Sequence, residues 1–220
     1  MTYKLYSGTK NASSWAMRAW LALREQAIDF EEHIVDLRKP QRFEELAKIG
    51  EISPSRSVPV LVTKSATIFD SSAIMEFASE QGKQPLLPVN SALRARVRSF
   101  VAWQHSGLSG ICPRLSFESA FYPKRRELLD EETSDCNRLF SAFENELTAH
   151  GGPYLFGDLT LADLAFAPTV VRLDAHKPVF ENSPQTKRWF EAVLSRDSVR
   201  EWLEEARNLP HIWLDGYLPN

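Results

Sequence analysis

The hydrophobic pattern changes once along the chain, and this change constrains the fold more than any other feature. The first 80 residues alternate short strand-like and helix-like patterns, whereas the patterns after residue 91 are helical. Between them, residues 81–91 read Gln-Gly-Lys-Gln-Pro-Leu-Leu-Pro-Val-Asn-Ser, a composition typical of a domain boundary. We therefore predict two domains, over residues 1–82 and 91–220.

The predicted fold class is α/β plus all-α, with the element order βαβαββα in the first domain. Strands are expected at 3–6, 30–35, 58–62 and 66–69, with helices around 15–23, at 41–49 and after Asp70. In the second domain we expect helices at 91–110, 130–149, 160–174, 184–195 and 197–208. Residues 111–123 give no clear prediction, because Pro113 interrupts the pattern.

Composition excludes several classes of partner. The 26 basic and 29 acidic residues give a net charge of −3, so no overall field attracts nucleic acid or an anionic membrane. The two cysteines, Cys112 and Cys136, form no CxxC pair and are expected to pack as small apolar residues. We therefore predict no disulfide framework and no metal site. With no signal peptide and no apolar run of about 20 residues, we expect a cytoplasmic protein.

The junction between the first strand and the first helix reads Lys10-Asn11-Ala12-Ser13-Ser14-Trp15. Ser13 or Ser14 is a good helix N-cap, and that role alone would explain hydroxyls here. The same position offers unpaired amides and the positive end of the helix dipole, so a hydroxyl donor there can also stabilise a bound anion such as a thiolate.

A proline precedes the third predicted strand, in the sequence Ser57-Val58-Pro59-Val60. Proline cannot donate to a sheet ladder, so a simple strand start explains it. If the Val58–Pro59 bond is cis, the backbone N–H and C=O of Val58 would instead be free to pair with an extended peptide ligand.

Asp70 and Ser71 stand at the next strand-to-helix junction, where both are good capping residues. The Ser71 amide and hydroxyl could also bind a ligand carboxylate at the helix start. Asp70 could then pair with an ammonium group, so the two would hold the end of an amino acid.

Thr160 and Asp163 form the S/T-x-x-D pattern of a capping box, with Leu159 placed to pack against Leu164. Amide hydrogen bonds at such a cap favour an ionised aspartate. We therefore expect a structural role for Asp163 and no role as a general acid or base.

Taken in this order, the four segments resemble the cytosolic glutathione S-transferases, which join a thioredoxin-like domain to a helical domain. The resemblance covers essentially the whole chain. Residues 10–18 look like the serine-containing motif of bacterial members and are similar to that of the zeta class, which includes maleylacetoacetate isomerases. Zeta enzymes read Ser-Ser-Cys-Ser before the tryptophan, however, whereas Asn11 and Ala12 occupy the first two places here.

The resemblance implies a role for each matching residue. Val58, before the cis-proline position Pro59, would pair with the cysteinyl part of glutathione, and Asp70 with Ser71 would hold its γ-glutamyl end. Ser13, with Ser14 second, would face the thiol; Tyr6 is the reserve candidate. Glutathione is then a co-substrate, and no metal is needed.

The predicted activity is conjugation of glutathione to small hydrophobic electrophiles, as in detoxification, by a homodimer. One alternative is glutathione-dependent isomerisation of a dicarboxylate, for which Arg18, Arg56 or Arg114 could supply cations. Another is a noncatalytic binding module of the same fold.

The basic run at 124–126 is interpreted as a solvated helix face. An electrophile pocket is expected between the domains, with Trp15, Trp103, His105, Ser106, Phe117, Phe121 and Tyr122 as candidate lining, although helical core packing is favoured for Trp103.

Overall fold

The computed structural model describes residues 2–106, 111–215 and 217. By their contacts these residues form two units. The first comprises the chain up to Pro85 together with Glu201–Ile212, and the second, helical unit comprises Leu86–Arg200 together with the chain from Trp213 on. Residues 201–212, which lie inside the domain predicted at 91–220, therefore have their contacts in the first unit. Among the described residues, no helix is long and apolar enough to cross a membrane.

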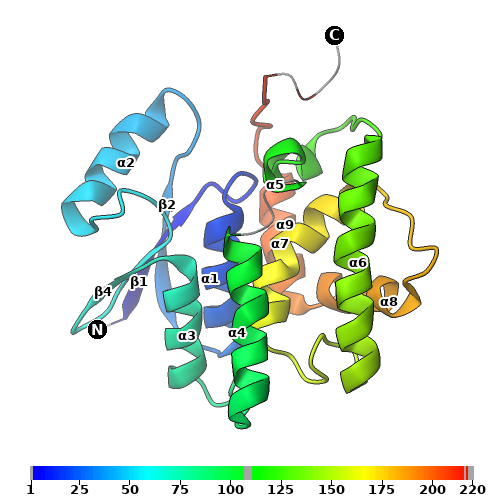
Figure 1. The fold of residues 1–220 in the computed structure, drawn as a ribbon. Helices are drawn as coiled ribbons and strands as arrows, with labels where there is room; N and C mark the ends of the chain where they lie inside the picture. Colours follow the sequence, from blue (N-terminus) through cyan, green and yellow to red (C-terminus); the bar gives the residue numbers. More distant parts are fainter. Residues whose placement is uncertain (1, 107–110, 216, 218–220) are drawn as a thin grey trace. The chain divides into compact units, whose positions relative to one another are not determined.

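The first unit has the predicted order βαβαββα. Its elements are β1 (Tyr3–Gly8), α1 (Ser14–Glu25), β2 (Phe30–Val35), α2 (Gln41–Ile52), β3 (Val60–Val62), β4 (Thr67–Phe69) and α3 (Ser71–Gln81). The strands form one mixed sheet in the order β2-β1-β3-β4, in which β1 runs parallel to β2 and antiparallel to β3 (Figure 1).

Alternating side chains on the central strands cover the two faces of this sheet. Leu5 and Leu61 are paired across β1 and β3 and are completely buried, and α1 and α3 pack together on their side of the sheet. Tyr6 and Val60 point to the opposite face, where they pack with Ile49 of α2. Figure 1 shows α2 on the side of the sheet away from α1 and α3.

The helical unit contains the predicted helices. They are α4 (Ser91–Ser106), α6 (Asp130–His150), α7 (Leu161–Ala175), α8 (Pro184–Leu194) and the start of α9 (Asp197–Arg207). The predicted end of α4 at residues 107–110 lies outside the described residues. The uncertain stretch forms a short helix α5 (Ile111–Arg114) and a 3₁₀ helix η1 (Phe117–Phe121). Residues 124–126 lie in the loop before α6, so their interpretation as a helix face is wrong.

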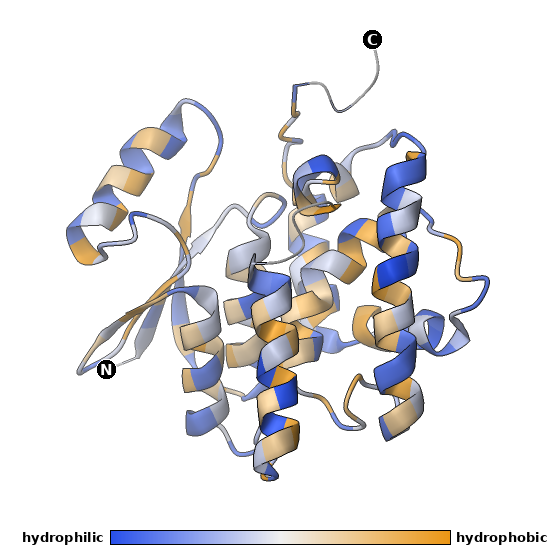
Figure 2. Ribbon diagram, viewed as in Figure 1, coloured by the Kyte–Doolittle hydropathy of each residue, from blue (hydrophilic) through white to orange (hydrophobic). Residues whose placement is uncertain are grey.

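Aromatic rings fill the centre of the helical unit. Phe166 of α7 lies 6.3 Å from Phe100, 5.9 Å from Trp103 and 4.9 Å from Phe143, measured between ring centroids. Trp103 therefore packs with the core of this unit, as favoured from the sequence. Hydrophilic and hydrophobic positions alternate along α6, as expected for a helix with one buried face (Figure 2).

The capping box at the start of α7 forms as predicted. The Thr160 amide and hydroxyl donate to Asp163 Oδ2 at 2.8 and 2.9 Å, and the Leu155 amide and Trp189 indole donate to Oδ1, both at 2.9 Å. The expected effect on ionisation is wrong in direction, because burial raises the pKa of Asp163 although all four hydrogen bonds favour the charged form.

We expect Asp163→Asn to lower the free energy of unfolding by about 3 kcal/mol. The asparagine amide can present its single oxygen to only one pair of donors, so the other pair loses its acceptor. Each buried donor left without an acceptor destabilises the folded state by about 1–3 kcal/mol. Urea unfolding followed by tryptophan fluorescence measures the loss. Asp130→Asn, at the exposed start of α6, is the matched control and should cost only a few tenths of a kcal/mol. Equal effects of the two substitutions would contradict this account of the cap.

Candidate functional site

The strand register brings the three predicted binding segments to one end of the sheet. Tyr6 of β1 pairs with Val60 of β3, and Val60 pairs with Phe69 of β4. Because both pairs are antiparallel, the residues after Tyr6, before Val60 and after Phe69 lie side by side. The end of β1, the Val58–Pro59 dipeptide and the start of α3 therefore share one edge of the first unit.

Ser13 is the N-cap of α1. Its Oγ accepts a hydrogen bond from the Ala16 amide at 3.2 Å, and the residue is buried. This bond uses a lone pair of the hydroxyl and leaves its proton available, and no acceptor for that proton occurs among the described residues. Ser14, the first residue of α1, is half-buried. A hydroxyl donor thus stands at the positive end of a helix.

Gly8 allows β1 to pass close to Ser13. A Cβ atom on Gly8 would lie 2.7 Å from Ser13 Cβ, 2.9 Å from Ser13 Oγ and 2.7 Å from Leu37 Cδ1. Two of these contacts are with the capping serine itself, so any side chain here displaces it. The position of the Ser13 hydroxyl therefore depends on a glycine at the end of β1.

Residues 201–212 fix the loop that carries Ser13. The Trp202 indole donates to the Lys10 carbonyl at 3.0 Å, and the Asn11 side-chain amide donates to the Pro210 carbonyl at 2.9 Å. The Lys10 ammonium is buried between the rings of Trp20 and Trp202, at 4.9 and 5.1 Å from their centroids. It also forms ion pairs with Glu32, at 3.2 Å, and Glu205, at 2.8 Å.

The Val58–Pro59 peptide bond is cis. The strand β3 begins only at Val60, so Val58 lies outside the hydrogen-bonded ladder. Val58 is half-buried and packs beside the apolar cluster of Val35, Ile49 and Val60.

Asp70 and Ser71 begin α3. Asp70 is exposed, and its Oδ1 accepts hydrogen bonds from the amide and the hydroxyl of Ser72, both at 2.8 Å. Its φ of 72° is unusual for a residue other than glycine and costs about 1–3 kcal/mol. Ser71 is buried, and its Oγ has no hydrogen-bond partner in the described part of the chain.

Tyr6, the reserve candidate, lies on the face of the sheet that α2 covers. Its ring stacks on His33 with the centroids 5.0 Å apart. Leu5 and Ser7, its neighbours along β1, point to the side of α1. The structure therefore groups Tyr6 with the α2 side of the sheet and Ser13 with the N-terminus of α1.

The arginines considered for a dicarboxylate differ in their surroundings. Arg18 is buried, and its guanidinium lies 4.0 Å from the ring centroid of Trp15. Arg114 forms an ion pair with Asp135 at 2.7 Å, so its charge is balanced within the helical unit. Arg56 is exposed and has a positive φ of 48°.

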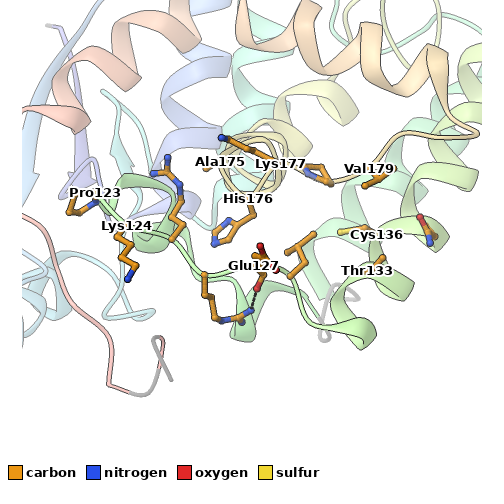
Figure 3. Close-up of a pocket in the computed structure, with 14 residues that line it drawn as sticks. Pro123, Lys124, Glu127, Thr133, Cys136, Ala175, His176, Lys177 and Val179 are labelled. Atoms are coloured by element: carbon orange, nitrogen blue, oxygen red, sulfur yellow. Dashed lines mark hydrogen bonds between the residues drawn. The ribbon is translucent and has the colours of Figure 1, made fainter. Parts of the chain in front are cut away.

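The helical unit contains a cavity of about 630 Å³ beside the start of α6. Figure 3 shows His176 in the middle of its lining, with Lys124 on one side and Cys136 on the other. Both ring nitrogens of His176 have partners, the Arg172 carbonyl at 2.7 Å and the Tyr217 hydroxyl at 2.6 Å. Burial raises the pKa of Cys136 to about 12, so its thiol is unreactive.

The basic groups near this cavity are largely engaged. Arg125 donates to the Tyr122 carbonyl at 2.7 Å, and Arg126 donates to Glu132 at 2.6 and 2.7 Å. Across the described ranges, no group of three His, Cys, Asp or Glu side chains is placed to hold a metal ion.

Family models agree with the two-part organisation. The model "Glutathione S-transferase, N-terminal domain" matches residues 12–81, and "Glutathione S-transferase, C-terminal domain" matches residues 98–197. Glutathione S-transferase Z1 of Arabidopsis thaliana is 34% identical over 173 residues, which cover 76% of this chain and 75% of that protein. The chain belongs to the glutathione S-transferase family.

Two further members of the family are similar to the chain. The probable maleylacetoacetate isomerase of Caenorhabditis elegans is 30% identical over 177 residues, covering 76% of each protein. The crystal structure of a glutathione transferase homologue from Burkholderia, with bound glutathione, is 28% identical with a TM-score of 0.69. That match covers 94% of this chain and 99% of the other.

The sequence places Lys10 in the first candidate segment but does not predict its contacts with Trp202 and Glu205. No local pattern links residue 10 to residues 200 positions later, so these contacts appear only in the folded chain. Gly8 gave a weak signal, because a glycine that ends a strand before a capped helix is a common place for close backbone approach.

We expect Gly8→Ala to lower the free energy of unfolding by about 1–3 kcal/mol, since the new methyl group overlaps Ser13 and Leu37. Gly50→Ala is the matched control. There the new Cβ meets only the flexible Arg56 side chain, at 3.1 Å, inside α2, so the change should be neutral or stabilising. Urea unfolding compares the two variants, and a harmless Gly8→Ala would show that Ser13 does not need the glycine.

Proposed function

We propose that the protein binds glutathione at the shared sheet edge and transfers its thiolate to small hydrophobic electrophiles. Membership of the glutathione S-transferase family supports glutathione transferase activity. The observation that carries the proposal is the Ser13 hydroxyl. This hydroxyl stands at the N-terminus of α1, and its proton has no acceptor among the described residues. A thiolate is the acceptor that this position favours.

The rest of the tripeptide fits the neighbouring groups. The Val58 backbone lies outside the ladder and would pair with the cysteinyl part of glutathione, next to the cis bond to Pro59. The Ser71 amide is in the first turn of α3, where amides have no intrahelical acceptor, and would bind the γ-glutamyl carboxylate. Asp70 would pair with the α-ammonium group.

Serine can supply the activation that this reaction needs. A free thiol has a pKa of about 8.5, and each unit by which the pKa falls corresponds to about 1.4 kcal/mol. A hydrogen bond to a charged group contributes about 1.5–3 kcal/mol, which lowers the thiol pKa by about one to two units. Ser13, with Ser14 second, therefore makes the thiolate a major species near neutral pH.

The transfer step requires only the thiolate and the electrophile. With a chloro-dinitrobenzene, the sulfur attacks the carbon that carries chlorine, a C–S bond forms, and chloride leaves with the C–Cl bonding pair. The thiol proton passes to solvent before the attack. The residues of the site hold glutathione and stabilise its sulfur anion.

Isomerisation of a dicarboxylate is the second candidate function, favoured by the similarity to the probable maleylacetoacetate isomerase. Of the three arginines considered, Arg114 already has an acidic partner and Arg56 is exposed. Arg18 is the best candidate of the three to bind a substrate carboxylate, because it belongs to α1, the helix that Ser13 caps. Analysis of products from a chloro-dinitrobenzene and from maleylacetoacetate separates the two activities, and loss of both favours a noncatalytic binding module.

We also propose that the protein works as a cytoplasmic homodimer in detoxification, with domains at 1–82 and 91–220. Dimers are typical of the family, and size-exclusion chromatography with light scattering measures the assembly. The electrophile pocket between the domains remains a prediction.

We expect Ser13→Ala to raise the pKa of bound glutathione by about one to two units and to lower kcat/KM by about 10- to 100-fold. Ultraviolet absorbance of the thiolate gives the pKa. Ser13→Thr, which keeps a hydroxyl, should retain most activity, and Ser14→Ala tests the second candidate. The assignment is wrong if Ser13→Ala, Ser14→Ala and the double variant all keep the wild-type pKa and rate.

We expect Asp70→Asn to weaken glutathione binding about 10-fold, because it removes the charge that faces the ammonium group and keeps an oxygen for Ser72. Calorimetry with glutathione and with N-acetylglutathione forms a double-mutant cycle. The variant and the wild type should bind N-acetylglutathione equally. A further loss with this analogue in the variant would place Asp70 away from the ammonium group.

A further inference from the structure

Arg172 is a buried cation in the last turn of an apolar helix. The helix α7 is buried at every residue from Leu161 to Leu173, and within this run the only charged residues are Asp163 and Arg172. Arg172 is 3% exposed. A guanidinium stays protonated in proteins, so this burial places a full positive charge inside the helical unit.

The partners of Arg172 do not balance its charge. Its single hydrogen bond runs from Nη1 to the Cys112 carbonyl, at a long 3.4 Å, and its Nε–H has no acceptor. The guanidinium lies 5.9 Å from the ring centroid of Phe117. The Cys112 side chain and, more weakly, Glu118 interact with it electrostatically, but no ion pair with Arg172 is formed by any residue of the described ranges.

Such a group is exceptional in a folded protein. Buried charges are normally paired, because removing an ion from water without a partner is strongly unfavourable. The C-terminal end of α7 favours a cation, but a helix dipole contributes far less than a hydrogen-bonded carboxylate. The arrangement thus lacks an anion.

Thr169 adds a second unsatisfied group on the same side of α7. It precedes Arg172 by three residues, so the two side chains are neighbours on the helix surface. Thr169 is 1% exposed, and its Oγ1 has no hydrogen-bond partner in the part of the chain that the structure describes. A threonine inside a helix usually donates to the carbonyl four residues earlier, and this one does not.

The neighbouring residues indicate the rest of the ligand. Phe117 lies beside the guanidinium and contacts Phe121 edge to face, with 5.3 Å between ring centroids. Ser116 precedes Phe117, and its buried hydroxyl oxygen has no hydrogen-bond partner among the described residues. Polar donors beside aromatic rings suit a carboxylate attached to a flat apolar group.

We propose that Arg172 and Thr169 form a binding site for the carboxylate of a small aromatic acid. The carboxylate accepts two hydrogen bonds from the parallel Nε–H and Nη2–H groups of Arg172 and a third from the Thr169 hydroxyl, while Nη1 keeps its long bond to Cys112. The aromatic group packs against Phe117. This site goes beyond the proposed function and does not depend on it, because the acid binds in the absence of glutathione.

Calorimetry with benzoate and benzamide tests the site in the full-length protein without glutathione. The two probes have nearly the same shape, and only benzoate carries a charge. We expect benzoate to bind the wild type about 10-fold or more tightly than benzamide. Arg172→Met should remove this preference, whereas Arg138→Met, at an exposed arginine of α6, should keep it.

The stability of Arg172→Met separates a binding role from a structural one. Without a ligand, we expect its urea midpoint to equal or exceed that of the wild type, because an apolar side chain replaces an uncompensated buried charge. Saturating benzoate should raise the midpoint of the wild type and leave that of the variant unchanged. A lower midpoint for Arg172→Met together with unchanged benzoate binding would overturn the proposal.

Thr169→Val provides a second test if Arg172→Met does not fold. Valine keeps the shape of threonine and removes the hydroxyl, so benzoate binding should weaken about 5-fold with no change for benzamide. Equal binding of benzoate and benzamide to the wild type, or an unchanged preference in Thr169→Val, would show that no carboxylate site exists here.

Discussion

The buried ammonium group of Lys10 is the interaction on which the arrangement of the first unit depends. It lies between the rings of Trp20 and Trp202, and its two carboxylate partners, Glu32 and Glu205, come from β2 and α9. A buried charge persists only where such partners surround it. One side chain thus ties three segments together, which explains why residues 201–212 belong with the first 85.

This anchoring has a consequence for the chemistry of the site. The Lys10 carbonyl accepts from Trp202, and the same loop continues into Ser13, whose hydroxyl stands at the start of α1. The antiparallel pairs around β3 add Val58 and Asp70 at the same edge. A small zwitterionic tripeptide bound at this edge, as we propose, would meet fixed backbone groups and a few placed charges, which requires no larger net charge than the −3 of this chain.

The sequence predicts the local elements well because each is encoded by neighbouring residues. The strand at Phe30–Val35 has the predicted bounds, and the capping box at Thr160 needs only four residues to specify it. The contacts of Lys10 with residues near 202 are not encoded locally, so they could not be predicted. The basic run at 124–126 shows the opposite error, since charge alone was interpreted as a helix although the chain there forms a loop.

The two buried charges of α7 illustrate how structure and function are distinguished. Asp163 receives four hydrogen bonds and holds the helix start, the segment before it and Trp189 together, so its burial is compensated within the chain. Arg172, nine residues later in the same helix, has one long hydrogen bond and no counter-ion in the described residues. Folding alone favours the first arrangement and opposes the second. On our proposal a bound carboxylate supplies the partner that Arg172 lacks, so that a stable fold carries a site that is unsatisfied until its ligand binds.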